Sequence, residues 1–304
     1  MTRRAVFTSI LGGYEKLNEQ PTALTSPVDF ICLTDDPSST SDTWHMVTVQ
    51  PLLACDPARS QRDFKIRGHA ALAEYDEVLY IDNTVRLLVD PDVILQDWLD
   101  GSDLTLVQHS FRATVLDEFD AVIASLLDDP ARVHEQLFHY AARYPAALAE
   151  QPSWNGMFAR RQTDEIRRLS EVWFSHVLRY SRRDQLSLNV ALADAGVGPR
   201  RVTMDNHRTD FHEWPVLNER RVAQVPGSAR SGPLLAEIGR LTRELDARIE
   251  QHEGDLAELR TDLHTAHATT ARLQAESAAV TDTLSWRVTR PLRWVRHMTS
   301  RARA

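Results

Sequence analysis

The first two hundred residues or so alternate short apolar runs with longer amphipathic stretches. Apolar runs bounded by turn-forming residues predict strands, and apolar positions that recur every three or four residues predict helices. Strands that alternate with helices favour an α/β domain built on a mainly parallel sheet. The predicted strands are 5–10, 29–33, 78–81 and 104–107. The predicted helices are 59–74, 115–128, 130–143, 163–178 and 183–195.

One predicted strand ends in a polar triplet. Residues 78–81 are apolar, and Asp82, Asn83 and Thr84 follow them directly. Ligands of parallel α/β sheets bind beyond the carboxyl ends of the strands, which is where this triplet falls. A carboxylate there suits Mg²⁺ or Mn²⁺ carried by a diphosphate. On the triplet alone, the alternative is a plain Asp-Asn turn that serves only the local backbone.

The pattern changes after residue 222. Residues 223–233 contain Gly, Ser and Pro and predict a linker. Across 234–285, apolar positions recur at alternating spacings of three and four, with one additional spacing of four. This pattern predicts a coiled coil with a stutter, and therefore a homo-oligomer.

The last predicted segment, 286–304, carries six arginines and no acidic residue. An apolar stripe with flanking arginines is typical of a helix that lies on an anionic membrane surface. A basic helix that binds an acidic partner is the alternative. The stripe consists of Leu284, Val288, Leu292, Val295 and Met298.

Composition excludes several classes of protein. The chain has 304 residues, of which 42% are hydrophobic, enough for one large domain and an appendage. A net charge of −8 argues against a nucleic-acid partner. We expect neither a secretory signal nor a membrane span. Two cysteines, Cys32 and Cys55, form no disulfide framework, which fits a reducing compartment and a cytoplasmic location.

Several segments within about residues 5–200 carry a resemblance when taken in order. They include DFICLTDDP, RSQRDFKIRGHAAL, YDEVLYIDNTV, WNGMFARR and SRRDQLSLNVALADAG. Together they resemble the glycosyltransferase-like domain of plant mucilage and pectin-related proteins and of many bacterial polysaccharide loci. The resemblance implies a GT-A-like, Rossmann-type nucleotide-sugar domain over 1–222. The segment SWRVTRPLR, residues 285–293, also resembles the tail that ends many bacterial polysaccharide glycosyltransferases.

The resemblance gives the polar triplet a role. Asp82, Asn83 and Thr84 take the place of the Asp-x-Asp metal motif, although this chain has threonine at the third position. One carboxylate gives a weaker metal site than two. Related enzymes bring a late histidine back to the metal, for which His207 and His212 are candidates, and imidazole binds Mn²⁺ well. We expect Asp82, Thr84 and His207 to hold the metal, and Asn83 to contact the donor.

Other residues are expected to contact the donor. Tyr14, after the first strand, suits stacking on a base, and Asp35, after the second, suits a uracil edge or a ribose. Arg62 and Lys65 lie on one short helix, where cations suit a diphosphate, and Arg112 suits a carboxylate or phosphate on donor or acceptor. The alternatives are a packed tyrosine, a turn aspartate and a solvated helix face.

Asp184 and Gln185 precede the last predicted helix of the domain. The resemblance places them against the transferred sugar, as in lipooligosaccharide galactosyltransferases and glycogenin-like enzymes, whereas the alternative is a capping role. The expected reaction moves a sugar from a UDP-linked donor to a glycan or lipid-linked glycan at the inner face of a bacterial membrane. The rival hypothesis is a degenerate, non-catalytic domain that serves as a scaffold through the coiled coil.

Overall fold

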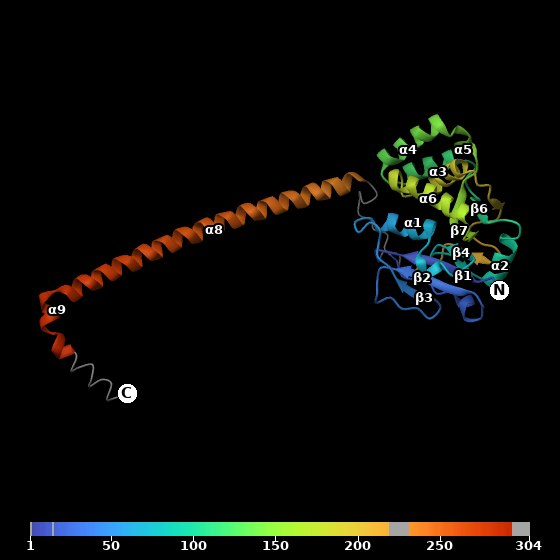
Figure 1. The fold of residues 1–304 in the computed structure, drawn as a ribbon. Coiled ribbons are helices and arrows are strands. Elements are labelled where there is room, and N and C mark those ends of the chain that lie inside the picture. The colour runs from blue at the N-terminus through green and yellow to red at the C-terminus, as the bar shows by residue number, and fades with distance from the viewer. Residues whose placement is uncertain (1, 14, 219–230, 294–304) are drawn as a thin grey trace. The chain divides into compact units, whose positions relative to one another are not determined.

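The fold is described from a computed structural model that covers residues 2–13, 15–218 and 231–293 (Figure 1). The chain divides into two compact units, Met1–Pro233 and Leu234–Ala304. Most of the predicted linker and the end of the predicted tail lie outside the described residues.

A seven-stranded sheet forms the centre of the first unit, in the order β3-β2-β1-β4-β7-β6-β8. Neighbouring strands run parallel except at β7, which lies antiparallel to both β4 and β6. The predicted mainly parallel sheet is therefore confirmed. The seven strands are β1 (Arg4–Ile10), β2 (Asp29–Thr34), β3 (His45–Thr48), β4 (Glu77–Ile81), β6 (Leu104–Gln108), β7 (Ser153–Arg161) and β8 (Arg200–Val202).

Helices cover both faces of the sheet because alternate strand residues point to opposite sides. Phe7 and Tyr80 pack with α1, α6 and α7 on one face, whereas Val6 and Leu79 pack with α2 on the other. A third cluster joins α3, α4 and α5 at one end of the domain (Figure 1). The helices are α1 (Pro57–Arg67), α2 (Pro91–Trp98), α3 (Val115–Ala124), α4 (Pro130–Arg143), α5 (Pro145–Ala149), α6 (Asp164–Arg179) and α7 (Leu188–Ala195).

Three predicted helices are shorter in the structure, and the one expected over 115–128 ends at Ala124. The helix expected over 59–74 ends at Arg67, because Gly68 takes a backbone φ of 82° that suits glycine, and a 3-10 turn follows at Ala70–Leu72. The helix expected over 183–195 begins only at Leu188, after a 3-10 turn at Asp184–Leu186. This last correction matters for the site, because it places Asp184 in the turn that precedes the helix.

The pattern did not predict β7. This strand, SWNGMFARR, contains Asn, Gly and two arginines, and all but its last residue are buried. Strands that are buried on both faces lack the alternation by which strands are recognised. A small antiparallel sheet of β5 (Arg86–Leu87) and β9 (His212–Glu213) was also not predicted.

The second unit is helical over its described length. A single helix, α8, runs from Ser231 to Asp282, and α9 follows at Leu284–Val288. The long helix expected over 234–285 is thus confirmed. Its pairing with another copy of the chain stays a prediction. No helix in the described part of the chain is long and apolar enough to cross a bilayer. The predicted seam residues with described side chains are exposed, namely Leu245, Ile249, Leu256, Leu259, Leu263, Leu273 and Val280.

Candidate active site

A cavity opens at the carboxyl ends of β1 and β4 and extends along the sheet towards β6. Eight of the residues singled out from the sequence line it, although they come from four separate parts of the chain. Glu15, Glu118 and Arg183 also line the cavity. Its wall therefore contains four cationic side chains and four carboxylates. The eight are Arg62, Lys65, Asp82, Asn83, Thr84, Arg112, Asp184 and Gln185.

The ammonium group of Lys65 lies between two carboxylates. Its Nζ is 3.0 Å from Asp184 Oδ2 and 3.4 Å from Asp82 Oδ1. The lysine is only 1% exposed, and its Nζ also lies 4.9 Å from the centre of the Tyr80 ring. A buried ammonium is tolerated only where opposite charges and hydrogen bonds replace its water. The two aspartates and the tyrosine supply that replacement.

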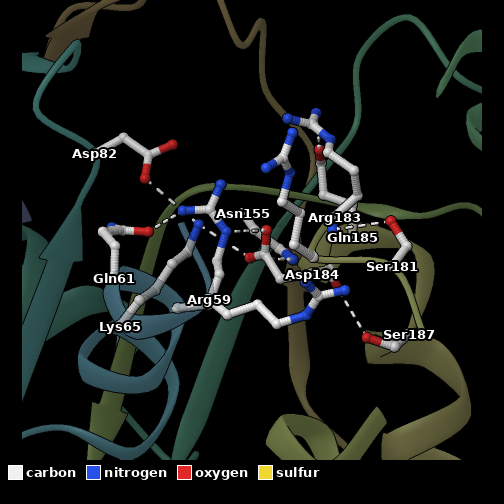
Figure 2. A network of polar contacts seen from close by, with 12 residues as sticks. Arg59, Gln61, Lys65, Asp82, Asn155, Ser181, Arg183, Asp184, Gln185 and Ser187 are labelled. Carbon is white, nitrogen blue, oxygen red and sulfur yellow. Dashed lines mark hydrogen bonds and ion pairs between the residues drawn. The ribbon is translucent and has the colours of Figure 1, made fainter. Parts of the chain in front are cut away.

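Asp184 is held from several directions. Arg62 Nε lies 3.0 Å from its Oδ1, and Asn155 Nδ2, from β7, donates to its Oδ2 at 3.2 Å. Burial alone would raise the pKa of Asp184, but the charges of Lys65 and Arg62 outweigh it and hold the pKa well below its ordinary value. The carboxylate is therefore ionised throughout the physiological pH range. Figure 2 shows Lys65 of α1, Asn155 of β7 and Asp184 of the turn before α7 pointing toward one another.

The position of α1 brings Arg62 and Lys65 to the site. Asp56 accepts a hydrogen bond from the Arg59 amide and caps the helix, with Pro57 in its first turn. The turn after β1 packs closely on this start, since a Cβ on Gly12 would lie 2.8 Å from Pro57 Cβ. At the other end, the buried Arg160 donates to the Ile66 carbonyl.

The capping alternative for Asp184 finds no support in the structure. Neither the 3-10 turn at Asp184–Leu186 nor α7 has a side-chain cap, and the Asp184 carboxylate contacts Arg62, Lys65 and Asn155 instead. Gln185 accepts a hydrogen bond from Arg183 at 3.1 Å and donates to the Ser153 carbonyl at 3.4 Å. The turn thus points the Asp184 carboxylate at the cavity, and Gln185 fastens the turn to β7.

The three residues after β4, Asp82 to Thr84, line the cavity and also bond to neighbouring segments of the chain. Asp82 Oδ1 accepts a hydrogen bond from the Tyr80 hydroxyl at 2.6 Å. Asn83 braces the segment after β1, accepting from the Asn18 amide at 2.7 Å and donating to the Lys16 carbonyl at 2.9 Å. Thr84 Oγ1 accepts from the indole of Trp214 at 3.0 Å. Only Asp82 presents a charge to the cavity.

Neither of the two late histidines lines the first cavity. His207 stacks on Phe111 at 5.3 Å and packs against Trp214 at 5.2 Å between ring centroids, and it does not line the cavity. His212 is buried, and its ring nitrogens contact the Thr209 hydroxyl and the Asn206 carbonyl. In this geometry His207 supports the aromatic wall of the cavity.

The donor atoms around Asp82 determine what kind of metal fits. Among residues 2–13, 15–218 and 231–293, no cluster of three or more His, Cys, Asp and Glu side chains could hold a metal ion. One carboxylate and the hydroxyl of Thr84 are too few for a cation held by protein alone. Mg²⁺ and its like are commonly bound by one or two carboxylates together with substrate phosphates and water. The site therefore fits a metal that arrives with a diphosphate.

The far wall of the cavity contains a second charged group. Arg112 Nε donates to Glu118 at 3.1 Å, and Arg183 Nη2 lies 3.8 Å from the other oxygen of the same carboxylate. Burial raises the pKa of Glu118 in spite of the two arginines. Burial, and then the charges of Arg112 and Arg183, lower the pKa of His109 to about 4, so the imidazole is neutral near pH 7.

A second cavity lies beside the first, at the ends of β1 and β2. Asp35 lines it, and both oxygens of its carboxylate accept from the Gly12 amide at 3.1 and 3.0 Å. Glu15 lines both cavities, so they adjoin. Tyr14, which we expected to stack on a base, lies outside the described residues.

Some residues of the site had no role assigned from the sequence. Asn155 and Tyr80 hold Asp184 and Asp82, and Phe111 and Trp214 form the aromatic wall. Asn155 belongs to the segment WNGMFARR. The family resemblance singled out this segment but assigned no role to Asn155. The contact of Tyr80 with Asp82 follows strand alternation, because residues two apart point to the same side.

Comparison with known proteins decides the family. The family profile described as TOD1/MUCI70, glycosyltransferase-like domain, matches residues 31–205, more than half of the chain. The chain belongs to this family. The matched range contains nearly all of the charged residues of the first cavity, including Lys65, Asp82 and Asp184.

One curated relative is similar over part of the chain. It is the probable hexosyltransferase MUCI70 of Arabidopsis thaliana, 28% identical over 155 residues. The similar stretch covers 48% of this chain and 27% of the relative. The chain thus matches about a quarter of the relative's length.

Proposed function

We propose that the first unit is a glycosyltransferase that moves a sugar from a nucleotide diphosphate donor to a glycan. The observation that carries the proposal is the buried Lys65 held between Asp82 and Asp184 at the strand ends, inside the family's domain. The name of the plant relative, a probable hexosyltransferase, supports a hexose as the transferred group. UDP is the expected nucleotide.

The two adjoining cavities give the donor an orientation. The nucleoside occupies the second cavity, where Asp35 faces the base or the ribose, and the diphosphate reaches Asp82 and Lys65. The transferred sugar then lies against Asp184 and Gln185. This order follows the general rule that ligands lie outside the carboxyl ends of the strands.

The charges of the cavity explain why a metal accompanies the donor. Arg62 and Lys65 are already paired with Asp184, and the four cationic groups of the cavity are matched by four carboxylates. A diphosphate adds negative charge that this balanced wall does not offset. A Mn²⁺ or Mg²⁺ ion held by Asp82, with Thr84 beside it, would supply that charge as a Lewis acid.

The chain's own residues stabilise the departing diphosphate. Negative charge grows on the leaving group as the bond to the sugar breaks, and Lys65 and Arg62 are fixed cations beside it. Asp184 keeps both cations in place and, with Gln185, orients the sugar hydroxyls. The cations need no rearrangement during the reaction because Asp184 already holds them.

The second unit would bring the enzyme to its acceptor. We propose that the exposed seam of α8 pairs with other copies as a coiled coil, and that the basic tail from residue 286 lies on an anionic membrane surface. The acceptor would then be a lipid-linked glycan at the inner face of a bacterial cell membrane, in cell-surface polysaccharide synthesis. The rival, a non-catalytic scaffold, draws support from Thr84 in place of a second metal-binding acid.

Calorimetry separates the enzyme from the scaffold. UDP should bind the wild-type protein more tightly with Mn²⁺ than without it, and Asp82→Ala should lose the part that depends on Mn²⁺. The matched control is Asp100→Ala, an exposed aspartate outside both cavities, which should behave as wild type. Unchanged affinity in a folded Asp82→Ala protein would remove Asp82 from the site, and no UDP binding by the wild type would favour the scaffold.

A further inference from the structure

The order of the strands leaves one end of the first cavity for the acceptor. The second cavity lies at β1 and β2, Asp82 follows β4, and Asn155 lies on β7. The residues that follow β6, His109 to Arg112, stand at the opposite end of this row from the nucleoside. If the donor lies as proposed above, on which this inference rests, the acceptor enters beside β6.

The wall at that end has a surplus of positive charge. Arg112 and Arg183 share one carboxylate, Glu118, and the nearby His109 is neutral near pH 7. The two cations Lys65 and Arg62, by contrast, are balanced by the two carboxylates of Asp82 and Asp184. Although the cavity as a whole carries as many carboxylates as cations, positive charge is in local excess at the acceptor end.

The two guanidinium groups have hydrogen-bonding capacity left over. Arg112 uses its Nε on Glu118 and its Nη1 on the Phe111 carbonyl. Arg183 has a buried Nε that meets no hydrogen-bond acceptor among the described residues. Each guanidinium carries five N–H donors in a fixed fork that matches the oxygens of a carboxylate or phosphate. A single anionic group placed between the two arginines would satisfy donors that the protein leaves unused.

An aromatic ring lies beside the two arginines. Phe111 is 44% exposed although it lines a polar cavity, and the guanidinium of Arg112 lies 5.2 Å from its ring centre. His207 stacks on this ring and holds its plane. The C–H face of a pyranose is apolar and packs on an aromatic ring, while its polar substituents reach outward. The ring and the cations together match a sugar that carries an anionic group.

We propose that Phe111, Arg112, Glu118 and Arg183 form the acceptor subsite, and that it selects a glycan with a carboxylate or phosphate on or next to the accepting sugar. Arg112 and Arg183 bind the anion, and Phe111 packs against the sugar ring. Glu118 is a positioning residue, because its buried carboxylate holds one arginine on each oxygen.

The test compares short oligosaccharides of equal length that are neutral, carry a uronic acid, or carry a phosphate. Their binding to the full-length protein is measured by ligand-observed NMR, with UDP and Mn²⁺ present. The wild type should bind at least one anionic member about tenfold or more tightly than the neutral one. The uronate and phosphate arms show which anion is preferred.

Substitutions locate the preference. Arg112→Gln and Arg183→Gln should each reduce the preference to less than about threefold, whereas Arg112→Lys, which keeps the charge, should retain part of it. The matched control is Arg182→Gln, whose arginine pairs with Asp128 and does not line the cavity. Circular dichroism confirms that each variant is folded. Equal binding of neutral and anionic glycans by the wild type, binding of none, or a preference that survives both substitutions would overturn the proposal.

A UDP titration of the same wild-type sample distinguishes the two proposals. UDP binding without an anionic preference overturns the acceptor subsite and leaves the donor site standing. An anionic preference without UDP binding supports the subsite and overturns the proposed donor site.

Discussion

Lys65 Nζ lies 3.0 Å from Asp184 Oδ2, and both side chains are almost completely buried. The pair joins the helix after β3 to the turn before α7, and Asp82 and Arg62 extend it at either end. Removing one member of such a buried pair leaves an uncompensated charge, which costs more than the pair itself contributes. The relationship therefore has consequences for stability as well as for the proposed reaction.

Asp184→Asn should lower the free energy of unfolding by about 3–5 kcal/mol, because the carboxylate that matches the buried Lys65 and the partly buried Arg62 becomes neutral. Urea unfolding of the two proteins measures the difference. The control is Asp164→Asn, an exposed aspartate whose pairing with Arg167 is screened by water, and it should lower the free energy of unfolding far less than Asp184→Asn. Equal costs for the two variants would contradict the buried pair.

The lowered pKa of His109 predicts how the free energy of unfolding depends on pH. Burial and the neighbouring arginines lower its pKa in the folded protein to about 4, whereas in the unfolded chain it is about 6.5. Between these values the unfolded chain binds a proton that the folded chain does not. This residue should therefore make the free energy of unfolding fall as the pH is lowered from about 6.5 to about 4.

His109→Gln removes that titration, so its unfolding free energy should decline less steeply over the same pH range, by a slope of about one proton. Urea titrations of both proteins at several pH values provide the comparison. Parallel declines in the two proteins would show that His109 is not kept neutral by the fold.

The apolar seam of α8 predicts an elongated dimer or trimer. Leu256, Leu259 and Leu263 are among the seam residues, and each is more than half exposed in the single chain. Association would bury them, so the full-length protein should be an oligomer and a chain ending at Gly227 a compact monomer. Light scattering on both decides the matter, and a monomeric full-length protein would refute the seam.

The basic tail predicts membrane binding that is sensitive to salt. Burial of the apolar stripe and attraction of the arginines to anionic lipid act together, each arginine contributing about 1 kcal/mol near the surface. The full-length protein should pellet with anionic vesicles at low salt and much less at high salt. A chain ending at Leu284 should stay in the supernatant. Equal behaviour of the two chains would favour an acidic protein partner for the tail.

Much of the sheet could be predicted because its strands are short apolar runs bounded by turns. The strand expected at 78–81 extends only one residue further, to Glu77, and the polar residues that follow it do reach a cavity. The antiparallel β7 was not predictable in the same way, since its buried arginine and asparagine read as loop residues. Arg160 is tolerated there because its guanidinium lies within about 6 Å of two aromatic rings and donates to the Ile66 carbonyl.

Eight of the residues chosen from the sequence line the first cavity, but their contacts with one another were not predictable. Sequence reasoning assigned Arg62 and Lys65 to the diphosphate and Asp184 to the sugar, as separate groups. The structure joins them, because α1 and the turn before α7 meet above β7. Such long-range pairing leaves no local pattern of spacing or periodicity. Asn83 likewise reads as a ligand-facing residue, although its amide braces the backbone.

Donor turnover tests the central claim most directly. The wild-type protein, incubated with a panel of UDP-sugars and Mn²⁺, should release UDP from at least one of them. Asp184→Asn, checked for folding under the assay conditions, should reduce that release by about a hundredfold or more, as expected for a group that acts at the reacting sugar. Near-normal turnover in the folded variant would exclude Asp184 from the reaction. Absence of turnover with every donor would contradict the glycosyltransferase itself.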